Sequence, residues 1–237
     1  MAGTILVTGG AGYVGSILTD KLLSRGYKVK ILDRFFFGKE PLSKHINNER
    51  LQLIKDDIRY DDGSIFDGVD AVIHLAAIAS DPASELDPEA AETINHEGAL
   101  HIAKLARQHG VKRFLFSSSA SVYGQADNLQ LTEESPLKPV SLYAKNKMMA
   151  EQGLLAMSDS SFSVTILRNP TVYGVSPRMR FDLIINIMTL TAFSDKKILV
   201  YGGGLQWRPH IHVKDLSDDF ITILEADVNL VENEIFN

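Results

Sequence analysis

The sequence predicts an α/β fold, a doubly wound and mostly parallel sheet with a small, incomplete C-terminal lobe. Three observations support this prediction. Short apolar runs alternate with segments of helical period, which is the pattern of strand–helix units in a parallel sheet. The runs are rich in Val, Ile, Leu and Phe with little polar alternation, as in strands covered on both faces. The first run also leads directly into a glycine-rich turn and then into a helical pattern.

The expected elements alternate along most of the chain. Apolar runs predict strands at Thr4–Thr8, Lys28–Leu32, Leu51–Lys55, Ala71–Leu75, Arg113–Ser117 and Ser163–Leu167. Periodic segments predict helices over Val14–Arg25, Pro88–His109, Leu142–Ala156 and Phe181–Phe193. Gly110 follows the second helix directly and is placed to act as its C-cap.

The strand–helix rhythm loosens after about Val172, and Gly202–Gly204 marks a tight loop. We therefore expect residues 1–172 to form the main domain. Residues 173–237 are expected to form a partial second lobe that is interleaved with it, so that later elements can return to the main sheet. The stretch Glu234–Asn237 reads as the middle of a strand, and we expect a continuing chain or a partner to cover it.

Composition excludes several classes of protein. Of 237 residues, 45% are apolar and 23% charged, which is ordinary for a globular chain. The net charge of −6 disfavours a protein that coats nucleic acid or a membrane surface. Without cysteine there is no disulfide framework, thiolate nucleophile or zinc–sulfur site. No apolar stretch is long enough to span a bilayer and no charged leader is evident, so we expect a cytoplasmic protein.

The glycine turn and a later acidic residue predict a dinucleotide site. Gly9, Gly12 and Gly15 form a G-x-x-G-x-x-G pattern that overlaps a G-x-G-x-x-G register. Either pattern lets backbone N–H groups at a helix N-terminus approach a pyrophosphate. Asp33 ends the second strand 18 residues after Gly15, where a carboxylate binds ribose hydroxyls and repels a 2′-phosphate. The adjacent Arg34 weakens this preference for NAD over NADP. The alternative interpretation of the glycines is a turn that is purely structural and binds no dinucleotide.

Tyr143 and Lys147 form a second candidate pair, because residues four apart share one face of a helix. A phenol with a pKa near ~10 is a poor base at neutral pH. A nearby ammonium, together with an oxidised nicotinamide, favours the phenolate and lowers that pKa. Tyr143 would then exchange a proton with a substrate hydroxyl. A Y-x-x-x-K pattern is common by chance, so the alternative is a packed tyrosine beside a solvated lysine.

A serine-rich stretch supplies the third element. Phe114–Phe116 has a buried-strand pattern and leads into Ser117–Gly124. The hydroxyls would therefore lie at the carboxyl edge of the sheet, where doubly wound folds bind ligands. Serines that only terminate the strand by bonding its backbone are the alternative.

Together these motifs resemble the extended short-chain dehydrogenase/reductase family, the sugar-nucleotide epimerases and dehydratases, over essentially the whole chain. The serine run is similar to that of UDP-glucose/galactose 4-epimerases, and it aligns Ser119, Tyr143 and Lys147 with the catalytic residues. The resemblance implies a Rossmann domain, NAD as cofactor and a nucleotide-diphosphate sugar as substrate. It also implies a homodimer formed through the tyrosine-bearing helix and the helix before it, with no nucleic-acid or membrane partner.

The resemblance also assigns binding residues. Asp57-Ile58 matches the family's adenine-contacting pair, Leu75–Ala77 the loop after the fourth strand, and Asn95 an Asn-x-x-Gly helix. The implied cofactor set is Gly9, Gly12, Tyr13, Val14, Gly15, Asp33, Arg34, Asp57, Ile58, Leu75, Ala76, Ala77, Asn95, Ser117, Tyr143, Lys147 and Pro170. The implied substrate set is Ser119, Thr171 and Arg208, with Arg178 and Arg180 as weaker phosphate candidates. His210 and His212 are expected to pack and hydrogen-bond rather than to bind a metal.

Departures from the family pattern narrow the reaction. Ala120 and Ser121 stand where dehydrating and decarboxylating members carry carboxylates, and the cysteine of GDP-fucose-type enzymes is absent. These departures favour NAD-dependent epimerisation through a transient 4-keto sugar. An NAD-linked reductase or dehydrogenase is the alternative, and a non-catalytic dinucleotide sensor or scaffold is a third reading. Thr171 replaces a frequent asparagine, which weakens the analogy with glucose/galactose binding.

Overall fold

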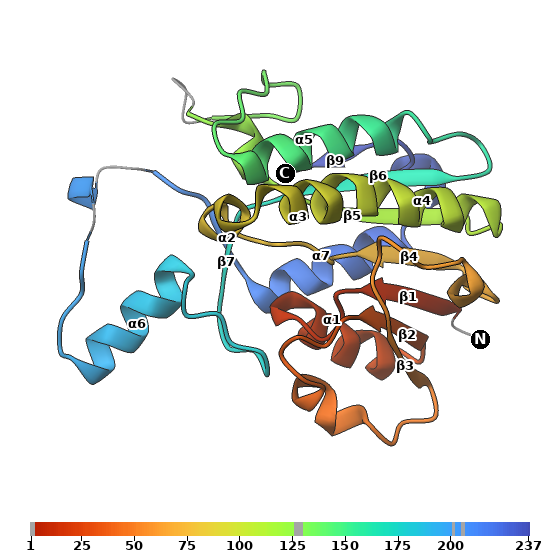
Figure 1. Ribbon diagram of the computed structural model, residues 1–237, viewed down its shortest axis with the longest axis horizontal. Helices are drawn as coiled ribbons and strands as arrows, with labels where there is room; N and C mark the ends of the chain where they lie inside the picture. The colour runs from red at the N-terminus through yellow and green to blue at the C-terminus, as the bar shows by residue number, and fades with distance from the viewer. Residues whose placement is uncertain (1–2, 126–129, 201, 205–206) are drawn as a thin grey trace.

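The computed structural model describes residues 3–125, 130–200, 202–204 and 207–237. Within these ranges the centre is a sheet of seven parallel strands in the order β3-β2-β1-β4-β5-β6-β9 (Figure 1). The strand order reverses between β1 and β4, and doubly wound sheets bind ligands beside such a reversal. The strands are β1 (Thr4–Thr8), β2 (Lys28–Asp33), β3 (Leu51–Lys55), β4 (Ala71–His74), β5 (Arg113–Ser119), β6 (Ser163–Asn169) and β9 (Ile235–Phe236).

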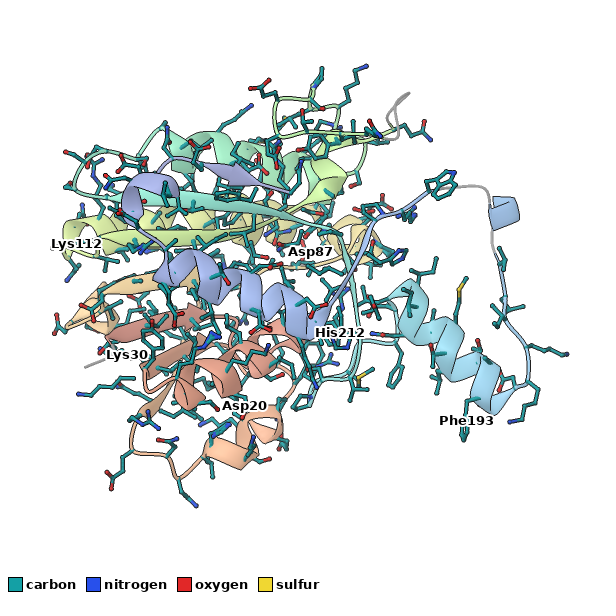
Figure 2. The ribbon with its side chains drawn as sticks, turned by 180° about the vertical axis from the view of Figure 1, so that it is seen from behind. Asp20, Lys30, Asp87, Lys112, Phe193 and His212 are labelled. Atoms are coloured by element: carbon teal, nitrogen blue, oxygen red, sulfur yellow. The ribbon has the colours of Figure 1, made fainter. Side chains whose placement is uncertain are left out.

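Helices cover both faces of this sheet. One layer contains α1 (Tyr13–Ser24) and α7 (Val213–Glu225), and the other contains α4 (Gly98–Gln108) and α5 (Leu142–Leu155) (Figures 1 and 2). Successive residues of β1 face opposite layers, since Ile5 and Val7 belong to one core cluster and Leu6 to the other. Burial on both faces explains the continuous apolar runs of the sequence. The predicted fold class is confirmed.

The helix expected over residues 88–109 is two helices joined by a wider turn. Helix α3 (Pro88–Glu92) leads into a π-helical turn at Thr93–Glu97, and α4 continues from it. π-Helical turns are rare and are frequent at functional sites, and this turn carries Asn95. A short helix, α2 (Asp81–Leu86), precedes α3 and was not expected from the sequence. Gly110 has φ 78°, as expected for the glycine that follows a helix C-terminus.

The last third of the chain leaves the main sheet and then returns to it. Strands β7 (Thr171–Tyr173) and β8 (His210–His212) form a small parallel sheet. Between them α6 (Ile184–Ser194) projects to the left in Figure 1, away from the central sheet. Helix α7 then packs beside α1, and β9 pairs with β6. We propose to retain the division into residues 1–172 and 173–237, with α7 and β9 counted with the main sheet.

The segment after β7 is attached to the start of α1 by buried polar contacts. The Tyr13 hydroxyl donates to the Gly174 carbonyl at 2.7 Å and accepts from Asn186 Nδ2 at 3.1 Å. Ser176 Oγ donates to the Tyr13 carbonyl at 2.7 Å and lies 3.0 Å from Ser16 Oγ. The lobe is therefore anchored directly behind the glycine turn.

Candidate active site

The turn between β1 and α1 is too tight for a side chain at Gly9 or Gly15. Gly9 has φ 72°, and its carbonyl accepts a hydrogen bond from the Gly12 N–H at 3.0 Å. A Cβ on Gly15 would lie 2.4 Å from the Gly9 carbonyl oxygen, and a Cβ on Gly9 would lie 2.8 Å from the Ala76 nitrogen. The N-terminus of α1 opens at the carboxyl end of β1. This cradle fits the pyrophosphate of a dinucleotide such as NAD.

Asp33 connects the glycine turn to the loop after β2. Its Oδ2 accepts from the Ala11 N–H at 3.0 Å, and its Oδ1 accepts from the Phe35 N–H at 2.8 Å. Each carboxylate oxygen has a second lone pair, so both bonds leave capacity for ribose hydroxyls. The position suits ribose binding, and it also gives Asp33 a structural task that the sequence did not reveal.

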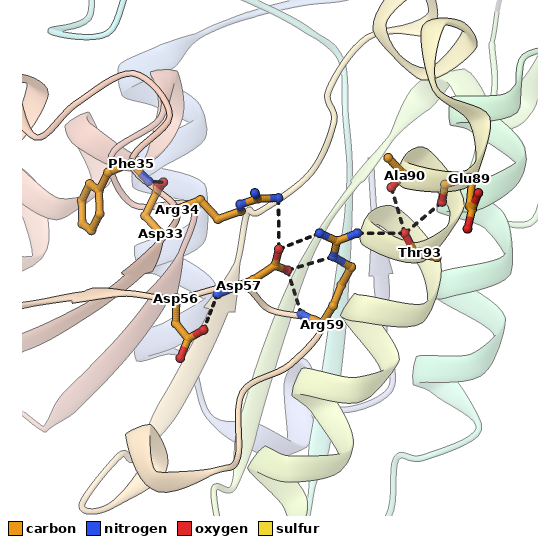
Figure 3. A network of polar contacts seen from close by, with 9 residues as sticks. All are labelled: Asp33, Arg34, Phe35, Asp56, Asp57, Arg59, Glu89, Ala90 and Thr93. Atoms are coloured by element: carbon orange, nitrogen blue, oxygen red, sulfur yellow. Dashed lines mark hydrogen bonds and ion pairs between the residues drawn. The ribbon is translucent and has the colours of Figure 1, made fainter.

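Asp57, expected beside the adenine, lies between two arginines (Figure 3). Its Oδ2 is 2.7 Å from Arg59 Nη2 and 3.1 Å from Arg34 Nη1, and its Oδ1 accepts from Arg59 Nε at 3.0 Å. Hydrogen bonds from Arg59 hold the pKa of the Asp57 carboxyl below its ordinary value. Sequence reasoning missed Arg59. A hollow of about 650 Å³ opens here, with Arg34, Phe36, Lys55, Asp57, Arg59 and Tyr60 among its lining residues.

The loop after β4 is held in place by Thr8 and Asn95. The Leu75 N–H donates to the Thr8 carbonyl at 3.1 Å, and the Ala76 N–H donates to Thr8 Oγ1 at 3.3 Å. The buried Asn95 amide accepts from the Ile78 N–H at 2.8 Å and donates to the Ile78 carbonyl at 3.0 Å. Asn95 thus fixes the course of this loop through the Ile78 backbone, and its place in the cofactor site stays a prediction.

The remaining expected cofactor residues lie around the same edge of the sheet. Ile58 is buried in the core cluster that faces α4, and a Cβ on Gly98 would touch its side chain at 2.9 Å. Val14 packs partly buried against the cluster that faces α7. Ala77 and Pro170 are half-buried, in the segments that follow β4 and β6.

Ser119, Tyr143 and Lys147 come together where β5 ends and α5 begins. Ser119 lies close enough to the Tyr143 hydroxyl to lower the pKa of that phenol. Lys147 is buried, and its Nζ donates to the Ser117 carbonyl at 2.7 Å. The same Nζ lies 5.9 Å from the centre of the Tyr143 ring. Ser141 caps α5 by accepting from the Ala144 N–H at 3.2 Å, so the tyrosine stands in the first helical turn.

The charges around this cluster differ from the sequence expectation. In the protein alone, burial raises the pKa of Tyr143 to about 12, and the Arg180 charge and the Ser119 hydrogen bond lower it only in part. Burial lowers the pKa of Lys147 to about 7, although the Glu151 carboxylate acts in the opposite direction. Lys147 therefore does not make the phenol acidic here. The reason is that both groups are removed from water, which disfavours both charged forms.

A buried polar network lies behind the cluster and was not anticipated. The Glu151 carboxylate pairs with Arg168 at 2.8 Å and also accepts a hydrogen bond from Ser118 Oγ. Arg168 Nη1 donates to the Tyr123 hydroxyl at 2.8 Å and to the Glu133 carbonyl at 3.0 Å. Glu151 stands one turn after Lys147, so its position on the Tyr143 face of α5 was the available signal.

The residues expected to bind the substrate do not form one cluster. Thr171 begins β7 and is half-buried, whereas Arg208 is exposed in the extended segment before β8. Arg180 reaches further inward, since its Nη2 donates to the Ala79 carbonyl at 2.9 Å and its charge acts on Tyr143. Arg178 stacks on the Phe37 ring at 3.7 Å. The structure thus favours Arg180, the weaker candidate from the sequence, as the cation nearer to the cluster.

In the described part of the chain, no group of three or more His, Asp or Glu side chains is placed to hold a metal ion. His212 caps α7, where its Nδ1 accepts from the Lys214 N–H at 3.3 Å. Each of the described helices is too short or too polar to span a bilayer.

The model of the NAD dependent epimerase/dehydratase family matches residues 5–237. The chain belongs to this family. It is 32% identical over 232 residues to UDP-glucuronic acid decarboxylase 1 of Xenopus tropicalis, covering 95% of this chain and 54% of the relative. It is 31% identical over 257 residues to UDP-glucose 4-epimerase of Bacillus subtilis, covering 98% and 76%. The chain thus spans about half of the decarboxylase and about three quarters of the epimerase.

Solved structures of related enzymes share the fold. UDP-N-acetylglucosamine 4-epimerase from Methanobrevibacter ruminantium M1, in complex with UDP-N-acetylmuramic acid, matches 99% of this chain and 75% of its own with a TM-score of 0.90 and 30% identity. UDP-glucuronic acid 4-epimerase from Bacillus cereus, in complex with UDP-glucuronic acid and NAD, covers 98% and 76% with a TM-score of 0.88 and 28% identity. The family resemblance seen in the sequence motifs is confirmed.

Proposed function

We propose that this protein is an NAD-dependent enzyme that inverts the carbon-4 centre of a nucleotide-diphosphate sugar through a transient 4-keto sugar. The observation that carries the proposal is the cluster of Ser119, Tyr143 and Lys147 at the sheet edge that also bears the glycine cradle. The 4-epimerases among the relatives support it.

Different residues bind the cofactor, transfer the proton and position the substrate oxygen. The turn from Gly9 to Gly15 holds the pyrophosphate of NAD, and Asp33 holds the ribose next to it. Bound NAD supplies the hydride chemistry at the carbinol carbon. Tyr143 takes the proton of the sugar 4-hydroxyl and later returns it, while the Ser119 hydroxyl donates to the same sugar oxygen. Lys147 is fixed beside the tyrosine by the Ser117 carbonyl. Tyr143 accepts the proton as a phenolate, a form that burial disfavours in the protein alone and that the positive charge of an oxidised nicotinamide favours.

Ser121 supports epimerisation over dehydration or decarboxylation. Its Oγ donates to Ser119 Oγ at 2.9 Å, and Ala120 beside it has no polar group. Removing a carboxylate or moving protons at carbons 5 and 6 needs a further acid or base, which a serine and an alanine do not provide. Sequence identity to the decarboxylases alone therefore does not decide the reaction.

The first prediction concerns the Tyr143→Phe variant. Because general acid–base catalysis contributes about 10²–10⁴-fold, we expect turnover to fall by about that factor while NAD binding stays unchanged. Turnover is measured by NMR on a panel of nucleotide-diphosphate sugars, and NAD binding by calorimetry. Tyr27→Phe, whose hydroxyl lies at the surface 3.3 Å from Glu225, is the matched control.

Each outcome of this panel bears on the proposal. Inversion at carbon 4 without net NADH supports epimerisation. Net accumulation of NADH assigns the alternative, an NAD-linked dehydrogenase or reductase. Stable NAD binding with no turnover of any sugar assigns a dinucleotide sensor or scaffold. Near-normal turnover of Tyr143→Phe would refute the catalytic assignment itself.

A further inference from the structure

Two arginines converge on the adenosine end of the cofactor site, and one carboxylate engages both of them (Figure 3). Arg34 directly follows Asp33, the position from which an arginine accommodates the 2′-phosphate of NADP. Arg59 approaches from the segment after β3, and its Nη1 is also within 3.4 Å of Thr93 Oγ1. The Asp57 carboxylate lies 3.1 Å from Arg34 and 2.7 Å from Arg59.

Asp33 alone is a weak barrier to a 2′-phosphate here. Both of its oxygens accept backbone N–H groups, from Ala11 at 3.0 Å and from Phe35 at 2.8 Å. These donors stabilise the carboxylate and offset part of the field that it exerts on a ligand. An additional negative charge is therefore needed to keep two guanidinium groups from attracting a phosphate of about −2 charge.

Asp57 is placed to supply that charge. Its carboxylate lies between the two guanidinium groups and pairs with both, whereas Asp33 pairs with neither. Arg34 is the more exposed of the pair, since its side chain is 42% exposed against 20% for Arg59, and its distance from the Asp57 carboxylate is the longer one, 3.1 Å against 2.7 Å. Its guanidinium also lies 4.3 Å from the centre of the exposed Phe36 ring, at the solvent side of the hollow.

We propose that Asp57 determines the preference for NAD over NADP by holding Arg34 and Arg59 in ion pairs. The inference rests on the proposed use of NAD at this site. It assigns the choice of cofactor to a residue that does not have to touch the 2′ position. Without the Asp57 charge, both guanidinium groups become available to a 2′-phosphate.

The test is the ratio of the dissociation constants of NAD and NADP, measured by calorimetry on the full chain without substrate. For Asp57→Asn we expect this ratio to shift toward NADP by about tenfold or more. Asp56→Asn removes the same charge from the same hollow, but no ion pair of Asp56 is found among the described residues. Asp56 Oδ1 accepts from the Asp57 N–H at 2.7 Å, and an asparagine oxygen can keep this bond. For Asp56→Asn we expect the ratio to change by less than about twofold. Adenosine 2′,5′-bisphosphate and 5′-AMP serve as smaller probes with the same expected order.

A second variant works in the opposite direction. Arg59→Leu removes one cation and leaves Asp57 to pair with Arg34 alone, so the ratio should move further toward NAD. Asp57→Glu keeps the charge and should stay close to the wild type. Thermal unfolding confirms that each variant is folded, and Arg59→Leu tests the inference even where Asp57→Asn does not fold.

The measurements distinguish a failure of the Asp57 inference from a failure of the proposed function. Equal shifts in Asp57→Asn and Asp56→Asn, or no shift in Asp57→Asn and Arg59→Leu, would overturn the role of Asp57 while NAD binding stands. A wild-type protein that binds neither NAD nor NADP would instead overturn the proposed function.

Discussion

Lys147 illustrates what burial costs a single charged residue. It is 2% exposed, and burial lowers its pKa to about 7, whereas a lysine in water titrates near 10.5. Between these values the unfolded chain holds a proton that the folded protein has released. The burial of Lys147 therefore costs no proton release above about pH 10.5. As the pH falls from there toward about 7, the free energy of unfolding decreases.

The second prediction follows from this difference in pKa. We expect the free energy of unfolding of the wild type, relative to Lys147→Met, to rise with pH from about 7 to 10, at up to ~1.4 kcal/mol per pH unit. Urea denaturation of the NAD-free protein at pH 7, 8 and 9 measures the slope. Tyr143 does not interfere, because burial raises its pKa to about 12 and its ordinary value is 10.0. If the free energies of unfolding of the wild type and of Lys147→Met change with pH by the same amount, the depressed pKa of Lys147 is contradicted.

At the scale of elements, the turn from β1 into α1 leaves no room for a methyl group at Gly15. The third prediction concerns Gly15→Ala, whose Cβ would lie 2.4 Å from the Gly9 carbonyl oxygen and 2.6 Å from Gly10 Cα. Backbone atoms cannot rotate away as a side chain can. We expect a cost of about 1–3 kcal/mol and a thermal midpoint lower by about 3–10 °C. NAD affinity should fall by at least tenfold, measured by calorimetry, because the N-terminus of α1 is displaced.

The control for this variant is Gly68→Ala. Gly68 has φ 68° and nothing within 4 Å of its added Cβ, so the substitution strains the backbone far from the glycine turn. It should lower stability and leave NAD affinity unchanged. A Gly15→Ala protein that binds NAD as tightly as the wild type would show that the turn is not a pyrophosphate cradle.

Sequence reasoning located the elements that depend on local pattern. Six strands were predicted because a continuous apolar run is unambiguous when both faces of a strand are covered. The spacing of Tyr143 and Lys147 placed both on one helix face for the same local reason. The π-helical turn at Thr93–Glu97 was missed, and so was the contact of its Asn95 amide with the Ile78 backbone, 17 residues away. Helix α7 was missed although Val213, Leu216 and Phe220 carry a helical period.

At the scale of the whole molecule, the attachment of the lobe could not be predicted from sequence. Tyr13 was expected only as a cofactor residue, yet its hydroxyl bonds the Gly174 carbonyl 161 residues further along the chain. Glu151 and Arg168 likewise pair across two different elements. Such contacts form between segments whose order in space is set by the folded sheet, and no local pattern records them. The Tyr13 bond joins the start of α1 to the segment that follows β7, and the Glu151–Arg168 pair joins α5 to β6.

The fourth prediction tests this attachment. Tyr13→Phe removes the hydroxyl that donates to the Gly174 carbonyl at 2.7 Å and accepts from Asn186 at 3.1 Å. Since a net hydrogen bond contributes about 1 kcal/mol, we expect amide exchange in α6 to accelerate by about fivefold or more while β5 and β6 exchange as before. Hydrogen–deuterium exchange with mass spectrometry measures both regions, and Tyr27→Phe is the control. Equal acceleration across the sheet would indicate global destabilisation, and unchanged exchange in α6 would show that other contacts hold the lobe to α1.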